Sequence, residues 1–165
     1  MMQNQTAMPK TSAGLLAYRT TNGQLEVFLA HPGGPYYIKQ DLGVWSIPKG
    51  EFTDEDPLDA AKREFEEEIG VAIDGEFTEL SPVKRKSGKI VYAWAVRADV
   101  DPAKVKSNTF ELEFPPRSGR IAEYPEIDRA DWFTIPVAKQ KILTYQLDLL
   151  AELVAKIFNL LETSS

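Results

Sequence analysis

The segment PLDAAKREFEEEIG, residues 57–70, constrains the fold more than any other part of the chain, because it predicts one short helix with defined ends and a defined buried face. Asp56 and Pro57 are typical of an N-cap and a first helical turn, and Gly70 is typical of the residue that ends a helix. The helical repeat gathers an apolar stripe from Leu58, Phe65 and Ile69. The helix therefore has to bury this stripe on another layer, which we expect to be a sheet.

The same helix places acidic side chains next to the apolar stripe. At about 100° per residue, Glu67 and Glu68 lie on either side of Glu64, whereas Glu66 points away. Their mutual repulsion and the helix dipole each cost ~0.3–1 kcal/mol at an exposed site, so a cation should offset them. Arg63 can neutralise one carboxylate, and the others are hard oxygen ligands of the kind that Mg²⁺ or Mn²⁺ prefers. A simple solvated acidic face is the alternative that spacing alone leaves open.

Short segments with alternating apolar residues predict strands before and after this helix. They are residues 12–18, 25–30, 44–47, 89–96 and 131–135. Asn22–Gly23 is typical of a hairpin turn, and Ser87–Gly88 predicts a second hairpin after residues 81–86. Residues 99–130 contain several prolines, so we expect mostly loops there, with one strand over 108–114. These features predict an α/β fold with a mixed, partly antiparallel sheet.

A second helix is predicted near the end of the chain. Apolar residues recur at spacings of four and three over residues 137–161, and Pro136 suits the first turn. This apolar face fits a helix packed on the sheet, and it also fits the seam of a dimer. The spacing does not separate these alternatives, so we expect a monomer or a homodimer.

Composition narrows the class of protein. The chain has 165 residues, of which 43% are hydrophobic, as expected for one domain over residues 11–162 behind a flexible N-terminal tail, residues 1–10. No segment approaches the ~20 apolar residues that cross a bilayer, so we expect no membrane partner. The absence of cysteine excludes thiolate chemistry and is compatible with the cytoplasm, our expected location. A net charge of −6 argues against a general nucleic-acid-binding protein.

Residues 48–71, PKGEFTDEDPLDAAKREFEEEIGV, resemble the signature of the Nudix hydrolases. In that signature a glycine, a glutamate and then Arg-Glu-apolar-x-Glu-Glu-x-Gly-apolar follow at fixed spacing. Gly50 matches the first glycine, Glu55 matches the isolated glutamate, and residues 63–71 match the remaining positions. One departure is visible, because the loop EFTD between Gly50 and Glu55 is one residue shorter than is usual in the family. The shorter loop bears on the expectation for Gly50, whereas the helical half is intact.

The resemblance implies a Nudix-like α/β/α sandwich and an enzyme that uses a divalent cation to hydrolyse a nucleoside diphosphate linked to another group. It implies that Glu64, Glu67 and Glu68 hold Mg²⁺ or Mn²⁺ and that the backbone of Gly50 contributes a ligand. It also implies that Arg63 orients these carboxylates, so that Arg63, Glu64 and Glu67 form the catalytic centre. Such a cation suits this chemistry because it neutralises the negative oxygens of a pyrophosphate.

Family members usually draw a further acid from outside the signature, as a metal ligand or a general base. Glu126 is our candidate for both roles, because YPEIDRADWF, residues 124–133, resembles the segment before the last strand in dinucleoside polyphosphate and RNA pyrophosphohydrolases. Three other acids compete with it, although surface charge explains them more simply: Glu111, Glu113 and Glu123.

The segment IPKGE, residues 47–51, resembles the branch of the family that acts on diadenosine tetraphosphate and RNA 5′ ends. This resemblance makes Lys49 a candidate phosphate contact. Tyr36, or its neighbour Tyr37, lies in a glycine-rich loop before the signature and is a candidate to stack on a nucleobase.

Lys84 and Lys86 are further candidates for substrate binding. Strand alternation places these two lysines on one face with Arg85 opposite, so the three cations cannot serve one site. A strand edge that keeps the protein in solution explains them equally well.

We therefore predict a cytoplasmic, Mg²⁺-dependent pyrophosphohydrolase whose partner is a small nucleotide, with a dinucleoside polyphosphate such as diadenosine tetraphosphate as one candidate. An RNA 5′-end or NTP pyrophosphohydrolase is the alternative, and the acidic net charge counts against RNA. A non-catalytic nucleotide-sensing module is another alternative, but such modules often lose the glutamates that this chain keeps. An isomerase of the same fold would need a catalytic cysteine, which is absent.

Overall fold

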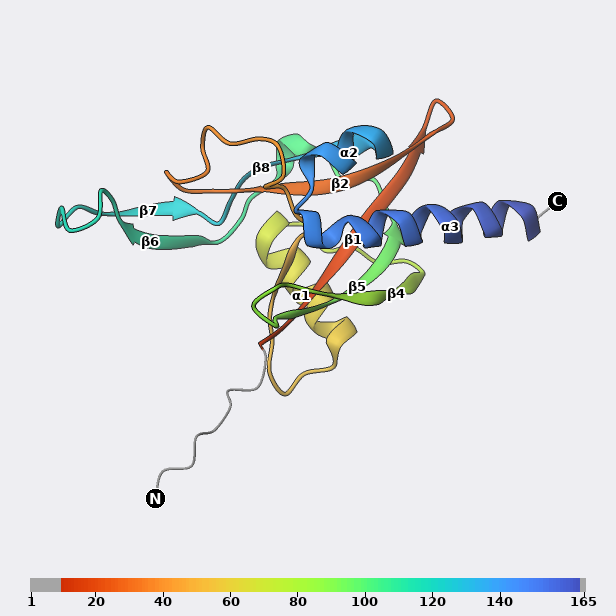
Figure 1. Cartoon of the computed structure of the whole chain (residues 1–165), viewed down its shortest axis with the longest axis horizontal. Coiled ribbons are helices and arrows are strands. Elements are labelled where there is room, and N and C mark those ends of the chain that lie inside the picture. The colour runs from red at the N-terminus through yellow and green to blue at the C-terminus, as the bar shows by residue number, and fades with distance from the viewer. Residues whose placement is uncertain (1–9, 164–165) are drawn as a thin grey trace, which may run out of the picture.

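The computed structural model in Figure 1 describes residues 10–163, and beyond Ile157 it describes the backbone only. The strands are β1 (Thr11–Thr21), β2 (Gln24–Pro32), β3 (Lys49–Glu51), β4 (Phe77–Lys84), β5 (Ile90–Arg97), β6 (Thr109–Glu113), β7 (Ile121–Pro125) and β8 (Ile127–Thr134). The helices are α1 (Pro57–Ile69), η1 (Pro102–Lys104), α2 (Ile135–Lys141), η2 (Thr144–Gln146) and α3 (Leu147–Thr163). The expected tail over residues 1–10 lies outside the described residues, apart from Lys10.

Strand β1 organises the main sheet, whose order is β4-β5-β1-β2-β8 with β3 also paired to β1. β5 runs parallel to β1 along residues 11–18, and the other pairings are antiparallel. On its second side β1 pairs with β3 over residues 12–14 and with β2 over residues 18–21. The predicted mixed sheet is confirmed. Because β1 changes partner halfway, the sheet opens between β2 and β3.

Helices cover both faces of this sheet, which confirms the α/β/α sandwich (Figure 1). On one face α1 buries Phe65 and Ile69 completely, and Phe65 lies 6.2 Å from Phe28 of β2 between ring centroids. On the other face α3 buries Leu150 and Leu153 in a second core that includes Leu16 and Leu29 of the sheet. The described apolar face of α3 thus packs on the sheet. Of the two alternatives for this helix, packing on the sheet and the seam of a dimer, the structure shows the first.

The helix over residues 57–69 is confirmed at both ends. The side chain of Asp56 accepts a hydrogen bond from the N–H of Asp59 at 3.1 Å, and Pro57 begins the helix. Gly70 has a left-handed backbone with φ of 85°, and its N–H donates to the carbonyl of Glu66 at 2.7 Å.

Residues 44–47 are not a strand, contrary to the prediction. The segment makes isolated bridges instead, from Ser46 to Ala30 of β2 and from Trp45 to Ile142. Further on, the carbonyl of Pro48 accepts a hydrogen bond from Leu15 of β1 at 3.2 Å. Each residue therefore pairs with a different neighbour, and residues 44–48, here called the inserted segment, fill the opening between β2 and β3. The apolar alternation reflects burial of the Trp45 and Ile47 side chains and not regular strand pairing.

The predicted helix over residues 137–161 is wrong as a single element. α2 ends at Lys141, and the chain is extended at Ile142 and Leu143 before η2 and α3 begin. The N–H of Leu143 donates to the carbonyl of Trp45 at 2.8 Å, and the Ile142 side chain is buried. Because this extended pair bonds the inserted segment, tertiary contacts override the helical periodicity.

The region over residues 99–130 contains two strands where one was expected. β6 and β7 form a separate two-stranded sheet that projects from the body as an arm (Figure 1). The expected strand over residues 108–114 corresponds to β6. β7 was not predicted because its side chains are mostly exposed and lack apolar alternation. The predicted strand over 131–135 begins earlier, at Ile127, and ends where α2 starts.

None of the helices within residues 10–163 is both long enough and apolar enough to cross a membrane.

Burial of Phe65 should be the main anchor of α1. Replacing Phe65 with alanine leaves a cavity between α1 and the sheet, so we expect the free energy of unfolding in urea to fall by about 3–5 kcal/mol. Glu66, the next residue on the same helix, is exposed, and Glu66→Ala should change it by less than about 0.5 kcal/mol. Similar effects of the two substitutions would contradict this account of α1.

Candidate active site

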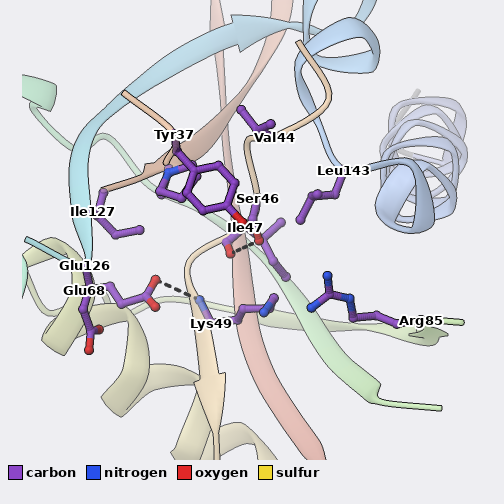
Figure 2. Close-up of a pocket in the computed structure, with 12 residues that line it drawn as sticks. Tyr37, Val44, Ser46, Ile47, Lys49, Glu68, Arg85, Glu126, Ile127 and Leu143 are labelled. Atoms are coloured by element: carbon purple, nitrogen blue, oxygen red, sulfur yellow. Dashed lines mark hydrogen bonds between the residues drawn. The ribbon is translucent and has the colours of Figure 1, made fainter. Parts of the chain in front are cut away.

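A cleft of about 270 Å³ opens beside the inserted segment, next to the end of α1 (Figure 2). Its residues fall into three groups. Two carboxylates, Glu68 and Glu126, lie at one end, and two cations, Lys49 and Arg85, lie at the other. The wall between them is apolar or aromatic and is formed by Ala30, Pro32, Tyr37, Val44, Ile47, Ile127 and Leu143, together with the hydroxyl of Ser46.

The carboxylate end gathers acids from two distant parts of the chain. Burial, aided by the charges of Glu126 and Glu64, raises the pKa of Glu68 to about 8. The pKa of Glu64 is also raised by burial, and Glu67 and Glu126 add to the effect. The structure therefore brings the signature glutamates and Glu126 within mutual electrostatic reach, in a site that lacks enough positive charge to balance them.

Arg63 holds the outer part of this acidic group. Its guanidinium donates to Glu55 at 2.9 Å, to Glu64 at 2.9 Å and to Glu67 at 3.2 Å. These contacts hold the pKa of Glu55 below its usual value and that of Arg63 well above its own. The shortened loop before α1 thus still delivers Glu55 to Arg63, because Asp54 adopts a left-handed backbone with φ of 53°.

Gly50 lies directly under Glu64. A methyl group on its Cα would stand 2.0 Å from Glu64 Oε2, so this position requires glycine if the carboxylate is to stay in place. The N–H of the preceding residue, Lys49, donates to Glu68 Oε2 at 3.2 Å (Figure 2). β3 therefore brings its backbone against two of the three signature glutamates that were predicted to hold a metal.

These residues fit a divalent cation by their chemistry. Oxygen donors from Glu64, Glu67, Glu68 and Glu126 are the ligands that Mg²⁺ and Mn²⁺ prefer, and because burial raises the pKa values of Glu64 and Glu68, a cation beside them would favour their charged forms. Among residues 10–163, no three acidic or histidine side chains are gathered tightly enough to hold an ion as they stand. Arg63 pairs with Glu64 and Glu67, so these two side chains would have to turn away from the guanidinium to share an ion with Glu68.

Backbone hydrogen bonds position Glu126. Its N–H donates to the carbonyl of Asn108 at 2.8 Å, and the N–H of Asn108 donates to the carbonyl of Glu67 at 3.1 Å. The base of the arm is thereby attached to the last turn of α1. Glu111, Glu113 and Glu123 lie farther out on the arm with exposed side chains and do not line the cleft. Among the four acids considered, the structure places Glu126 beside the signature glutamates.

At the opposite end of the cleft the structure places Lys49, as expected, and Arg85. Burial lowers the pKa of Lys49, and the nearby charges of Lys89 and Arg85 lower it further. Arg85 also stacks on Tyr145, with its guanidinium carbon 5.1 Å from the ring centroid. This end is therefore a concentration of positive charge suited to phosphate oxygens.

Lys84 and Lys86 do not line the cleft, whereas Arg85 does. The prediction from strand alternation placed Arg85 on the opposite face. Arg85 and the two lysines are thus separated as alternation requires, but the side that faces the cleft is the one that carries Arg85, so the choice of Lys84 and Lys86 as cleft residues was wrong. β4 ends at Lys84, and the N–H of Arg85 donates to the carbonyl of Lys89 at 2.9 Å in the turn that follows.

Tyr37, and not Tyr36, lines the cleft (Figure 2). Tyr36 turns toward the arm and packs edge-on against Phe114, with ring centroids 5.3 Å apart. The loop that carries both tyrosines is held by the buried His31, whose Nε2 lies 2.6 Å from the carbonyl of Gln40 and whose Nδ1 lies 2.8 Å from Asp128. His31 therefore has a structural place behind the cleft.

Gly50→Ala should separate metal binding from folding. The added methyl group displaces the flexible end of Glu64, so we expect Mn²⁺ affinity to fall by roughly 10- to 100-fold, as it does when groups that support metal ligands are removed. Urea unfolding of the metal-free variant should change by less than about 1 kcal/mol, because the side chain that moves is partly exposed. Electron paramagnetic resonance measures the Mn²⁺ affinity. If the Gly50→Ala protein bound Mn²⁺ as tightly as wild type, the contact between Gly50 and Glu64 would be unimportant for metal binding.

The raised pKa of Glu68 should make the metal-free protein less stable as the pH rises. The folded carboxyl has a pKa of about 8 against an ordinary value of 4.5, so its stabilising contribution is complete below about pH 4.5 and is lost as the pH rises through 8. In EDTA, we expect the unfolding temperature of the wild-type protein to fall relative to that of Glu68→Gln as the pH rises over this range. Adding Mg²⁺ at pH 8 should raise the unfolding temperature of the wild-type protein again. Glu66→Gln is the exposed control. Parallel pH profiles for wild type and Glu68→Gln would contradict the assignment.

Comparison with known proteins agrees with this geometry. A model of the NUDIX domain matches residues 8–152. No curated protein sequence matches the chain. A Caenorhabditis elegans Ap4A hydrolase, solved as a binary complex, is 23% identical with a TM-score of 0.63, and the match covers 91% of this chain and 98% of that one. The NUDIX domain of Shewanella oneidensis NrtR, solved with ADP ribose, is 13% identical with a TM-score of 0.62 and coverage of 90% and 88%.

A mutT/nudix family protein from Listeria innocua is 17% identical, with a TM-score of 0.59 and coverage of 94% of this chain and 98% of that one. At these identities the likeness to solved structures shows a shared fold. The family model spans most of the chain, and the signature glutamates stand on α1 around Arg63 as described above. The chain therefore belongs to the Nudix family and is a Nudix hydrolase.

Proposed function

We propose that this protein is a pyrophosphohydrolase that requires Mg²⁺ or Mn²⁺ and cleaves a phosphoanhydride bond in a nucleoside polyphosphate. A dinucleoside polyphosphate such as diadenosine tetraphosphate is the leading substrate. One observation carries the proposal: a single cleft joins a carboxylate end, a cationic end and an aromatic wall. These are the features that a cation, a polyphosphate and a nucleobase require.

Each end of the cleft has a separate task in this proposal. A divalent cation, when bound, supplies the positive charge that neutralises the diphosphate oxygens and activates water. Glu64, Glu67, Glu68 and the Gly50 backbone hold it, and Arg63 keeps the first two carboxylates oriented. Glu126 faces the same space from the base of the arm and accepts the proton of the attacking water.

The cationic end and the aromatic wall bind the rest of the substrate. Lys49 and Arg85 hold phosphate oxygens, and their mutual repulsion favours an anion between them. Tyr37 offers the face of its ring to a base. The resemblance of residues 47–51 to the diadenosine tetraphosphate branch and the shared fold with an Ap4A hydrolase support a dinucleoside substrate. The acidic net charge of −6 argues against long RNA.

The proposal is tested by incubating the protein and Mg²⁺ with dinucleoside polyphosphates, nucleoside triphosphates and nucleotide sugars in ¹⁸O-labelled water. We expect the highest kcat/KM for a dinucleoside polyphosphate, with the label in one product phosphate. The position of the label identifies the phosphorus that is attacked. Absence of hydrolysis across the whole set, with Mg²⁺ and with Mn²⁺, would reject the proposal.

Glu126→Gln should remove most of the turnover, because the amide keeps the shape of the side chain but cannot accept a proton. We expect kcat to fall by about 10²- to 10⁴-fold, as for loss of a general base. Glu111→Gln, on the exposed part of the arm, is the matched control and should retain wild-type kinetics. Loss of activity in Glu111→Gln, with full activity in Glu126→Gln, would show that the outlying acid has been assigned wrongly.

A further inference from the structure

The wall of the cleft carries one hydroxyl whose hydrogen bonds are unusually well defined, that of Ser46. Ser46 lies in the inserted segment and lines the cleft between Val44 and Lys49, below the ring of Tyr37 (Figure 2). The other residues of this wall, apart from Tyr37 itself, have no polar side-chain atoms: Ala30, Pro32, Val44, Ile47, Ile127 and Leu143. The Ser46 hydroxyl is therefore the polar side-chain group that this wall can offer to the edge of a base stacked on Tyr37.

The buried side chain of Gln146 determines which hydrogen bond Ser46 accepts. Gln146 is completely buried, and the N–H of Ile47 donates to its Oε1 at 3.1 Å. A backbone N–H is only a donor, so the oxygen of this amide must face it and the nitrogen must point the other way. Gln146 Nε2 then donates to Ser46 Oγ at 2.9 Å and to the hydroxyl of Tyr145 at 2.9 Å.

The proton of the Ser46 hydroxyl is also committed. Ser46 Oγ donates to the carbonyl of Ile47 at 2.7 Å. A serine hydroxyl has one proton and two acceptor positions, and Gln146 occupies one of these positions. The group that remains for a ligand is thus a hydrogen-bond acceptor.

We propose that Ser46, oriented by Gln146, is a specificity-determining residue that accepts a hydrogen bond from the 6-amino group of adenine and so favours adenine over 6-oxopurines. The proposal rests on the proposed function only in placing a nucleobase against Tyr37. A 6-oxo group would face the Ser46 acceptor with an acceptor of its own. The hydroxyl would then have to turn away from the carbonyl of Ile47 to donate to the base. Losing one net hydrogen bond corresponds to a preference of roughly 2- to 10-fold for the amino base.

Binding of AMP and IMP tests this directly, because the two nucleotides differ in the 6-amino and 6-oxo groups and no hydrolysis is needed. In titration calorimetry with Mg²⁺ present, we expect wild type to bind AMP roughly 2- to 10-fold more tightly than IMP. Ser46→Ala should bring the ratio of the two dissociation constants close to one. Ser46→Thr keeps the hydroxyl and should preserve the preference. Ser118→Ala, which removes a hydroxyl from the exposed tip of the arm, is the matched control and should keep the wild-type ratio.

Three results would overturn the proposal: equal affinity of wild type for AMP and IMP, an unchanged ratio in Ser46→Ala, or no binding of either nucleotide. If the Ser46→Ala protein fails to fold, the comparison of wild type with Ser46→Thr decides. Loss of the preference for AMP in Ser46→Thr would also contradict the proposal. The two proposals fail differently. Discrimination of AMP from IMP without hydrolysis of any polyphosphate rejects the catalytic proposal alone. Hydrolysis with equal kcat/KM for adenine and hypoxanthine substrates rejects the role of Ser46 alone.

Discussion

Burial of one face of α1 on the sheet is the constraint on which the rest of the site depends. Phe65 and Ile69 are inaccessible to solvent, so the helix cannot rotate about its axis without exposing them. The glutamates adjoin this apolar stripe and are therefore carried to the edge of the sheet, where β3 approaches. Glu64 and Glu68 lose solvent there, which raises their pKa values, and Arg63 offsets only part of the accumulated charge. The fold thus keeps a partly buried acidic group whose charged form a cation would stabilise.

The opening between β2 and β3 supplies the other half of the cleft. β1 exchanges one partner for the other along its length, and residues 44–48 fill the space with single contacts instead of a strand. Gln146 and Leu143 secure this segment from the C-terminal part of the chain. The same short stretch then continues into Lys49 and Gly50, so the residues proposed to contact the base, the phosphates and the cation follow one another closely in the chain.

The base of the arm, at Asn108 and Glu126, contacts the cleft region, whereas its tip does not line the cleft. Asn108 joins the end of α1 to Glu126, and the carbonyl of Glu126 accepts a hydrogen bond from Gly33 in the loop that leads to Tyr37. These backbone hydrogen bonds therefore link Glu126, the last turn of α1 and the aromatic wall. Tyr36 packs on the arm and Tyr37 faces the cleft, so the two neighbouring rings have separate places.

The sequence by itself determined the elements whose causes are local. Capping by Asp56, the apolar stripe of α1 and the hairpin turn at Asn22–Gly23 depend on neighbouring residues, so their patterns predicted helix and hairpin correctly. The family signature likewise predicted the acidic group around Arg63. Only the tertiary structure decided which of the outlying acids meets this group, that Arg85 and Tyr37 face the cleft, and that the last helix breaks at Ile142. The place of Glu126 and the break at Ile142 depend on backbone hydrogen bonds between residues far apart in the chain, and because almost any residue type can make such bonds, their partners leave no pattern in the sequence.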